Sequence, residues 1–303
     1  MAAVVLALAA ALCNALATIF ERLGVETAPA GAEMHLRLMT YVLRRPVWFL
    51  GFASMIGAFM FQVAALSEGG LTLVQPLLVS ELIFLVAILR IWFGRPLGWR
   101  EAAGVGLTVI GLATFLAVSN QGGGDDLPSS LGWLLVITAS AGAVVVAVFM
   151  ARFGSRPWRS AWYGTGAAIS FALVAAFMKS TTTLESRIGF VHLFTHFEPY
   201  GIAVGGLCGL FLTQNAFHAG PITSSQAALV IVDPIASIVI GVSLFGDNLR
   251  GSLGALAADA FALAIMSAGL FILCHSPLIV NTTAEDRLSR SRDPKGRPSA
   301  STA

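Results

Sequence analysis

The chain has 303 residues and a formal net charge of +2, and 56% of its residues are hydrophobic while only 11% are charged. Globular domains carry about 25% charged residues, so a soluble protein of this composition would expose large apolar patches to water. Together with a mean hydropathy of +0.82, this excludes a soluble enzyme, a nucleic-acid-binding protein or a disordered scaffold as a description of the whole chain. A polytopic membrane protein remains.

Nine stretches of the chain are each long and apolar enough to cross a bilayer as a helix, which takes about 20 residues. In chain order they cover residues 2–20, 46–67, 70–91, 101–119, 131–151, 160–178, 199–218, 223–245 and 252–274. Their apolar runs are continuous, whereas the strands of a membrane barrel alternate over about 10 residues. The sequence therefore predicts an all-α fold with about nine transmembrane helices.

Two stretches outside these spans have a different composition. Residues 28–45 contain one Glu, one His and three Arg, and a charge at mid-bilayer costs at least about 2.5–3.5 kcal/mol. We therefore interpret this stretch as an interfacial amphipathic segment in preference to a tenth span. Residues 276–303 are rich in Ser, Arg, Pro and Thr, which favours a disordered cytoplasmic tail.

The basic residues indicate how the chain is oriented. With nine spans, all of the 18 Lys and Arg residues except Lys179, Arg187 and Arg250 fall on one side of the membrane. Cytoplasmic loops carry an excess of Lys and Arg. We therefore expect a multi-pass protein of the cell membrane, with its N-terminus outside and its C-terminus in the cytoplasm.

Two parts of the chain resemble each other at an offset of about 152 residues. The matched positions are Gln62 with Gln214, Glu81 with Asp233, and Phe93-Gly94 with Phe245-Gly246. The spans that carry matched residues run in opposite directions, as in transporters built from inverted repeats. We therefore expect two inverted repeats of four and five spans, over residues 1–120 and 131–275, with a ligand site between them near the midplane.

Three acidic residues lie inside the predicted spans. Glu81 and Asp233 are near the middle of the third and eighth spans, and Asp259 lies in the ninth. A carboxylate at this depth faces a cavity, pairs with a partner or stays protonated. Glu81 and Asp233 are therefore candidates for binding a cation or exchanging a proton, and the alternative is a structural hydrogen bond between helices. Asp259 is either a third acid on the same path or a partner for a neighbouring side chain.

Amide side chains are the other polar groups embedded in the spans. Candidates for binding a solute are Gln62, Gln75, Gln214, Asn215 and Gln226, and Asn14 is a further embedded amide. Amides can coordinate a cation or hydrogen-bond a polar metabolite, but each can also hold two helices together, at about 0.6 kcal/mol. As a set they favour a polar pathway through the membrane.

Proline and glycine mark two further features of the spans. Pro76 and Pro234 lie in the spans that carry Glu81 and Asp233. A proline leaves the backbone carbonyl one turn earlier without its helical hydrogen bond. Such a carbonyl can line a cavity, and the alternative is a kink that only serves helix packing. Glycines recur every four residues in the seventh span, at Gly201, Gly205 and Gly209. This spacing allows close contact with a neighbouring helix.

Short motifs in both halves resemble a known transporter superfamily. In the second half these are Val232-Asp233-Pro234 and Gly246-Asp247-Asn248-Leu249, followed by Gly269-Leu270. They resemble the second unit of EamA-like members of the drug/metabolite transporter superfamily. The resemblance implies two inverted helical units and alternating access.

The first half is also similar to the NIPA branch of magnesium transporters. The similarity lies in Arg44-Arg45-Pro46-Val47-Trp48-Phe49-Leu50-Gly51 and in Leu73-Val74-Gln75-Pro76-Leu77, and Gly104 and Gly111 follow. It implies nine helices and a divalent cation such as Mg²⁺ as substrate. That branch carries an acidic residue beside a glycine in the second span, whereas Gly57 to Gln62 contains none.

The function expected from these observations is transport of a small polar or cationic solute, with Mg²⁺ as one case. The alternatives are a proton-coupled exporter of metabolites or lipophilic cations, and a non-transporting accessory subunit of the membrane. An intramembrane aspartyl protease is not expected because Ala257-Ala258 precede Asp259 in place of a Gly-x-Gly motif. We expect no cofactor and no nucleic-acid partner, a bilayer environment, and a monomer or homodimer; no metal ligands are assigned.

Overall fold

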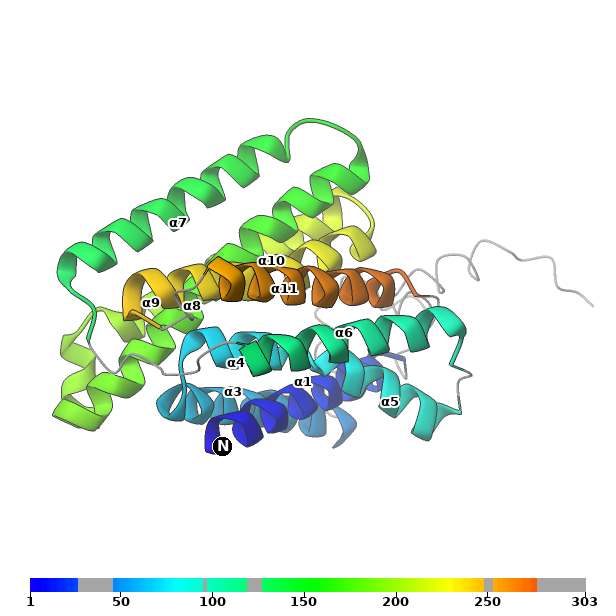
Figure 1. The fold of residues 1–303 in the computed structure, drawn as a ribbon, viewed down its shortest axis with the longest axis horizontal. Coiled ribbons are helices and arrows are strands. Elements are labelled where there is room, and N and C mark those ends of the chain that lie inside the picture. The colour runs from blue at the N-terminus through cyan, green and yellow to red at the C-terminus, as the bar shows by residue number, and fades with distance from the viewer. Residues whose placement is uncertain (27–45, 95–96, 119–126, 248–252, 277–303) are drawn as a thin grey trace, which may run out of the picture.

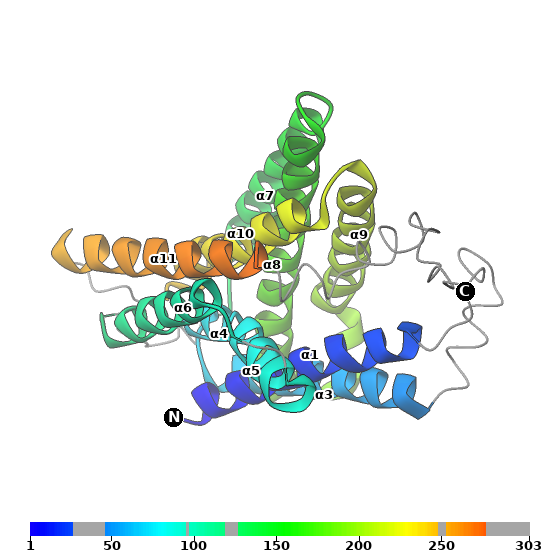
Figure 2. The same cartoon turned by 90° about the vertical axis from the view of Figure 1, so that its right-hand side faces the viewer.

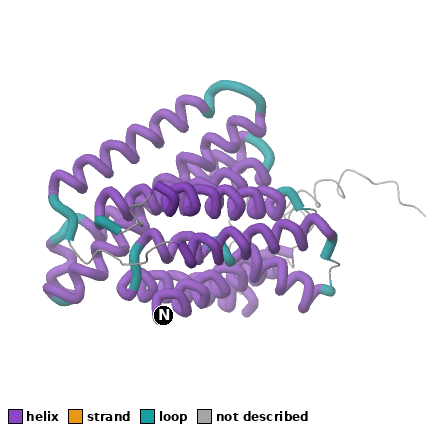
Figure 3. The backbone as a smooth tube through the Cα atoms, viewed as in Figure 1, coloured by secondary structure: helices purple, strands orange, loops and turns teal. Residues whose placement is uncertain are grey.

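Helices make up the regular structure throughout the described part of the chain (Figures 1 and 3). The computed structural model describes residues 1–26, 46–94, 97–118, 127–247 and 253–276. The expected all-α fold is therefore confirmed over these ranges. The segment 28–45 and the tail beyond Ser276 lie outside the described residues, and so do the predictions made for them.

The first half of the chain forms five of the helices. They are α1 (Ala2–Glu26), α3 (Pro46–Glu68), α4 (Leu71–Leu78), α5 (Glu81–Phe93) and α6 (Trp99–Val118). The second half forms α7 (Ser130–Met150), α8 (Arg156–Ile188), the short 3₁₀ helix η1 (Phe190–Thr195), α9 (Glu198–Ala219), α10 (Ile222–Phe245) and α11 (Leu253–Cys274).

Eight stretches of the described chain are long and apolar enough to cross a membrane, and they indicate a membrane protein. They correspond to eight of the nine expected spans. The remaining one, 199–218, forms α9, a helix of 22 residues that is not among the eight. The sixth span is longer than expected, because α8 continues over 33 residues to Ile188.

The third span is two helices instead of one. Its α4 part ends at Leu78 and its α5 part begins at Glu81, so that Val79 and Ser80 form a turn between them. The Ser80 hydroxyl donates a hydrogen bond of 2.7 Å to the Leu77 carbonyl. Helices interrupted inside a membrane are tolerated where the freed backbone lines a cavity or is buried in protein, so the turn marks a position of interest.

The helices pack in pairs that connect the two halves of the chain. Within the halves, α1 packs along α3, and α8 packs along both α9 and α10. Between the halves, α6 packs along α11, and α4 contacts α10 (Figures 1 and 2). The α4–α5 turn is therefore surrounded by helices from both halves.

Glycines permit the close contact between α6 and α11. A Cβ atom at Gly111 would lie 2.5 Å from the Met266 nitrogen and 2.7 Å from the Ala262 carbonyl oxygen. A Cβ at Gly269 would lie 2.6 Å from the Thr108 nitrogen. These neighbours are backbone atoms, which cannot turn aside as a side chain can, so the two helices would have to separate to admit any side chain here.

We expect Gly111→Ala to destabilise the protein by about 1–3 kcal/mol, the usual effect of overpacking a tight interface. The matched control is Gly106→Ala on the same helix, where an added Cβ meets nothing within 4 Å. That change should be neutral or stabilising, because Ala favours helix over Gly by about 1 kcal/mol. Thermal unfolding of both variants in detergent, followed by tryptophan fluorescence, measures the difference; equal midpoints would contradict the packing argument.

Candidate functional site

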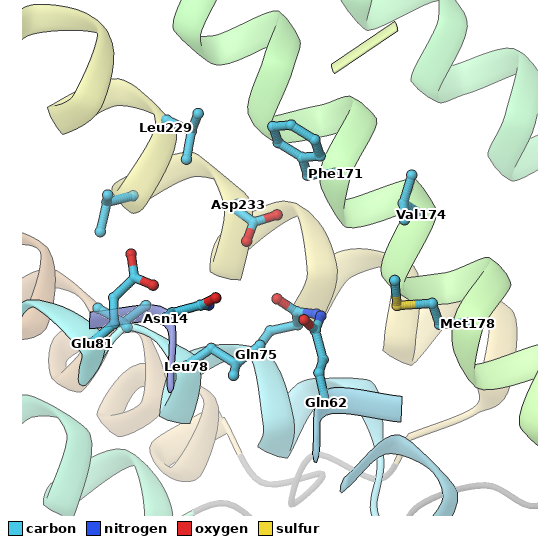
Figure 4. A pocket seen from close by; sticks show the side chains of 12 residues that line it. Asn14, Gln62, Gln75, Leu78, Glu81, Phe171, Val174, Met178, Leu229 and Asp233 are labelled. Atoms are coloured by element: carbon cyan, nitrogen blue, oxygen red, sulfur yellow. The ribbon is translucent and has the colours of Figure 1, made fainter. Parts of the chain in front are cut away.

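Side chains from six helices line a cavity of about 250 Å³ inside the helix bundle (Figure 4). The polar lining residues are Asn14, Gln62, Gln75, Glu81 and Asp233. The others are Leu78, Val79, Phe171, Val174, Met178, Leu229 and Val230. The cavity therefore brings together Glu81 and Asp233, which are 152 positions apart in the chain, with three amides.

Glu81 reaches the cavity because the third span breaks beside it. It is the first residue of α5 and follows the turn at Val79 and Ser80. The first turn of a helix carries the positive end of the helix dipole, so this position favours a carboxylate. The Asn14 side chain of α1 donates a hydrogen bond to Glu81, which fixes the carboxylate at the edge of the cavity.

Asp233 approaches the same cavity from the opposite side, on α10 (Figure 4). Pro234 follows it and is fully buried, but α10 continues through this proline without a break. The Asp233 Oδ1 and Gln75 Nε2 atoms are both buried, and neither has a hydrogen-bond partner among the described residues. The lining residues thus include one buried acceptor atom and one buried donor atom whose hydrogen-bonding capacity is not used within the described part of the chain.

The apolar side of the cavity is held in place by the glycine stripe of α9. Added Cβ atoms at Gly205 and Gly209 would lie 2.8 Å from Val174 and 2.7 Å from the Phe171 ring. The expected close helix contact is therefore present, with α8 as the partner helix. The sequence did not indicate a role in binding for the apolar lining residues, Phe171 and Val174 among them.

Four of the eight predicted binding residues do not line the cavity. Gln214 is exposed on α9, and the Asn215 amide donates a 2.7 Å hydrogen bond to the Phe211 carbonyl of its own helix. Gln226 is partly buried near the start of α10, and Asp259 is buried on α11 with 4% of its surface exposed. Asn14, which the sequence indicated only as an embedded amide, takes a place in the lining.

A second polar cluster, which we call the turn contact, lies around the turn from α3 to α4. It comprises Gly69, Gly70, Thr72, Lys179 and Asp247. The Lys179 ammonium donates a 3.0 Å hydrogen bond to the Gly69 carbonyl, and Asp247 Oδ2 accepts from the Thr72 amide at 3.1 Å and from its hydroxyl at 3.0 Å. These bonds join the α3–α4 turn to α8 and the start of α4 to the residue that follows the C-cap of α10.

Glycines make room for the Asp247 side chain in the turn contact. Gly246 ends α10 in the left-handed conformation, with φ of 65°, and this turns the chain back so that Asp247 follows. A Cβ at Gly70 would lie 2.9 Å from Asp247 Oδ2, and one at Gly241 would lie 2.8 Å from it. Asp247 and Lys179 are only 3% and 2% exposed, so both charged groups depend on the polar atoms around them.

The turn contact adjoins the cavity along two helices. Met178 lines the cavity and Lys179 follows it on α8, while Thr72 precedes the lining residue Gln75 by about one turn of α4. Among the described residues, no group of three or more His, Cys, Asp or Glu side chains is arranged to hold a metal ion.

Comparison with known proteins gives one informative relative. The chain is 24% identical over 248 residues to an uncharacterized protein of Corynebacterium glutamicum. The aligned region covers 82% of this chain and 86% of the relative. No family model matches the chain, and no solved structure matches it.

Proposed function

We propose that this chain is a membrane transporter that binds a small cationic or polar solute in the cavity and moves it by alternating access. The observation that supports this most directly is the meeting of Glu81 and Asp233, from two apolar helical segments, at one cavity. Ionisable groups inside membrane helices are unfavourable and mark pathways for ions and substrates. The interrupted helix beside Glu81 is also typical of transporter binding sites.

We include α9 as the ninth span of this transporter. Val204, Leu207 and Phe211 are each between 68% and 69% exposed on this helix. Such a row of exposed apolar side chains is unfavourable in water and suited to lipid. Its opposite face carries the glycines that contact α8, so α9 has one lipid-suited face and one packed face.

The inverted repeat belongs to the same proposal. Gly94 and Gly246 end α5 and α10 in the left-handed conformation, with φ of 59° and 65°. Each follows the acidic residue of its half by the same interval, from Glu81 to Gly94 and from Asp233 to Gly246. This parallel supports a repeat, although α10 is continuous where α4 and α5 are separate.

The turn contact would close one end of the cavity in this mechanism. It joins the two halves within a turn of the lining residues Gln75 and Met178. With the orientation that the charge distribution predicts, this end would face the outside of the cell. Breaking the turn contact would let α3 and α4 separate from α8 and α10 at that end. The conformation described has this contact formed.

Labelling of a cavity cysteine tests alternating access without knowledge of the substrate. In a chain with Cys13, Cys208 and Cys274 replaced by Ala, we expect Leu229→Cys to react with an impermeant methanethiosulfonate reagent from either face of oriented membrane vesicles. Val191→Cys on η1, at a position 79% exposed, should react from one face only and reports vesicle orientation. Labelling of Leu229→Cys from neither face would contradict transport and favour an accessory subunit.

A further inference from the structure

We propose that the cavity binds a small organic ammonium compound that also carries a hydrogen-bond acceptor, such as a short amino alcohol, in preference to a metal ion. This inference rests on the proposed transport function and names the substrate class of the same site.

The cavity has a polar side and an apolar side (Figure 4). Asn14, Gln62, Gln75 and Glu81 lie along one side, on helices of the first half of the chain, with Leu78 as an apolar neighbour among them. Phe171, Val174 and Met178 of α8 and Leu229 of α10 lie across from them, and Asp233 points into the space between. A ligand that satisfies both sides needs a charged or polar end and a hydrocarbon part.

A divalent metal ion fits this lining poorly. Ca²⁺ and Mg²⁺ take shells of six or more oxygen ligands, but seven of the twelve residues that line this cavity are apolar. An ion that kept its waters would press several of them against Phe171, Val174 and Leu229, where they would lose hydrogen bonds. The described residues also contain no cluster of three or more metal-binding side chains.

An organic ammonium ion fits both sides. Its charge can lie between the Glu81 and Asp233 carboxylates, its carbon chain can contact Val174 and Leu229, and the Phe171 ring can attract the cation by its π face. The cavity has a volume of about 250 Å³. This matches a compact amine and is smaller than a drug-sized ligand requires.

The two unused polar atoms favour a ligand with both a donor and an acceptor. Asp233 Oδ1 can accept from an ammonium N–H, whereas Gln75 Nε2 needs an oxygen to donate to. Buried polar atoms without partners are destabilising, and a ligand that satisfies them gains specificity. A hydroxyl or carbonyl oxygen on the amine would satisfy Gln75, and a bare metal ion would not.

A set of matched probes tests the substrate class with purified protein in detergent. The probes are 5-amino-1-pentanol, which has both groups, n-pentylamine, which lacks the acceptor, 1-pentanol, which lacks the charge, and MgCl₂, all at constant ionic strength. We expect a saturable rise in the thermal unfolding midpoint with the amino alcohol, at a Kd at least about fivefold below that of pentylamine. Pentanol and MgCl₂ should give no saturable rise.

Two variants connect this effect to the cavity. Glu81→Gln should weaken binding of both amines at least tenfold, while the exposed matched control Glu185→Gln should not change it. Gln75→Leu should remove the preference for the amino alcohol, so that its Kd rises to that of pentylamine for the same variant. A saturable rise with MgCl₂ alone, equal Kd values for the two amines, or no rise with any probe would overturn the proposed class.

These results are separable from the test of transport. If Leu229→Cys is labelled from both faces but only MgCl₂ stabilises the protein, the ammonium assignment fails and transport stands. If the cysteine is labelled from neither face, the transport function fails whatever the probes show.

Discussion

Replacing Glu81 by Gln, or Asp233 by Asn, is expected to lower the transport rate by about 10- to 100-fold and to leave the protein folded. A hydrogen bond to a charged group contributes about 1.5–3 kcal/mol, and each 1.4 kcal/mol corresponds to a factor of ten. The amides have nearly the same shape as the carboxylates but cannot neutralise a cation. Uptake of radiolabelled 5-amino-1-pentanol into proteoliposomes, or of Mg²⁺ followed with an enclosed indicator, measures the change.

The unfolding midpoint separates this functional role from a structural one. Both carboxylates line the same cavity and face each other across it. Replacing either one by its amide therefore removes the repulsion between the two negative charges and the free-energy cost of burying one of them. We therefore expect an unchanged or higher midpoint in each variant. A lower midpoint with normal uptake would show that Glu81 and Asp233 only hold helices together. Glu185→Gln, on the exposed surface of α8, controls for loss of charge alone.

The helices of this protein could be predicted from sequence because the thickness of a bilayer sets their length. A span needs about 20 apolar residues, and eight of the nine predicted spans correspond to long apolar stretches of the described chain. The break at Val79 and Ser80 could not be located in the same way. Pro76 indicates a disturbance, but Pro234 lies within an uninterrupted α10, so a proline alone does not tell a kink from an interruption.

The composition of the cavity could be predicted only in part, because sequence gives the depth of a residue more readily than its direction. Glu81 and Asp233 lie at similar depths in their spans, and both line the cavity. Gln214 corresponds to Gln62 in the predicted repeat, but only Gln62 lines the cavity, and Gln214 is exposed on α9. One signal was available for Gln214. Residues on a helix are separated by about 100°, so Gln214 lies about 140° from Gly209, away from the face that contacts α8.

Asp247→Ala is expected to destabilise the protein more than any other single change in the turn contact. It removes the acceptor of two hydrogen bonds from Thr72, both in a buried setting, and leaves the Thr72 amide without this partner. A hydrogen bond to a charged group contributes about 1.5–3 kcal/mol, and a neutral one about 0.5–1.5 kcal/mol. Thr72→Val keeps the amide bond and loses only the hydroxyl bond, so its unfolding midpoint should lie between those of Asp247→Ala and the wild type.

The labelling rate of Leu229→Cys shows whether the turn contact also governs access to the cavity. If the contact closes the outer end, Asp247→Ala should speed labelling from outside and slow it from inside. The change removes hydrogen bonds from the outward-closed conformation only, so the equilibrium between the two conformations moves toward the outward-open one. Gly111→Ala provides the comparison, since it destabilises the α6–α11 pair, which lies outside the cavity lining. A lower midpoint in Asp247→Ala with both labelling rates unchanged would show that the turn contact is a structural tie and not a gate.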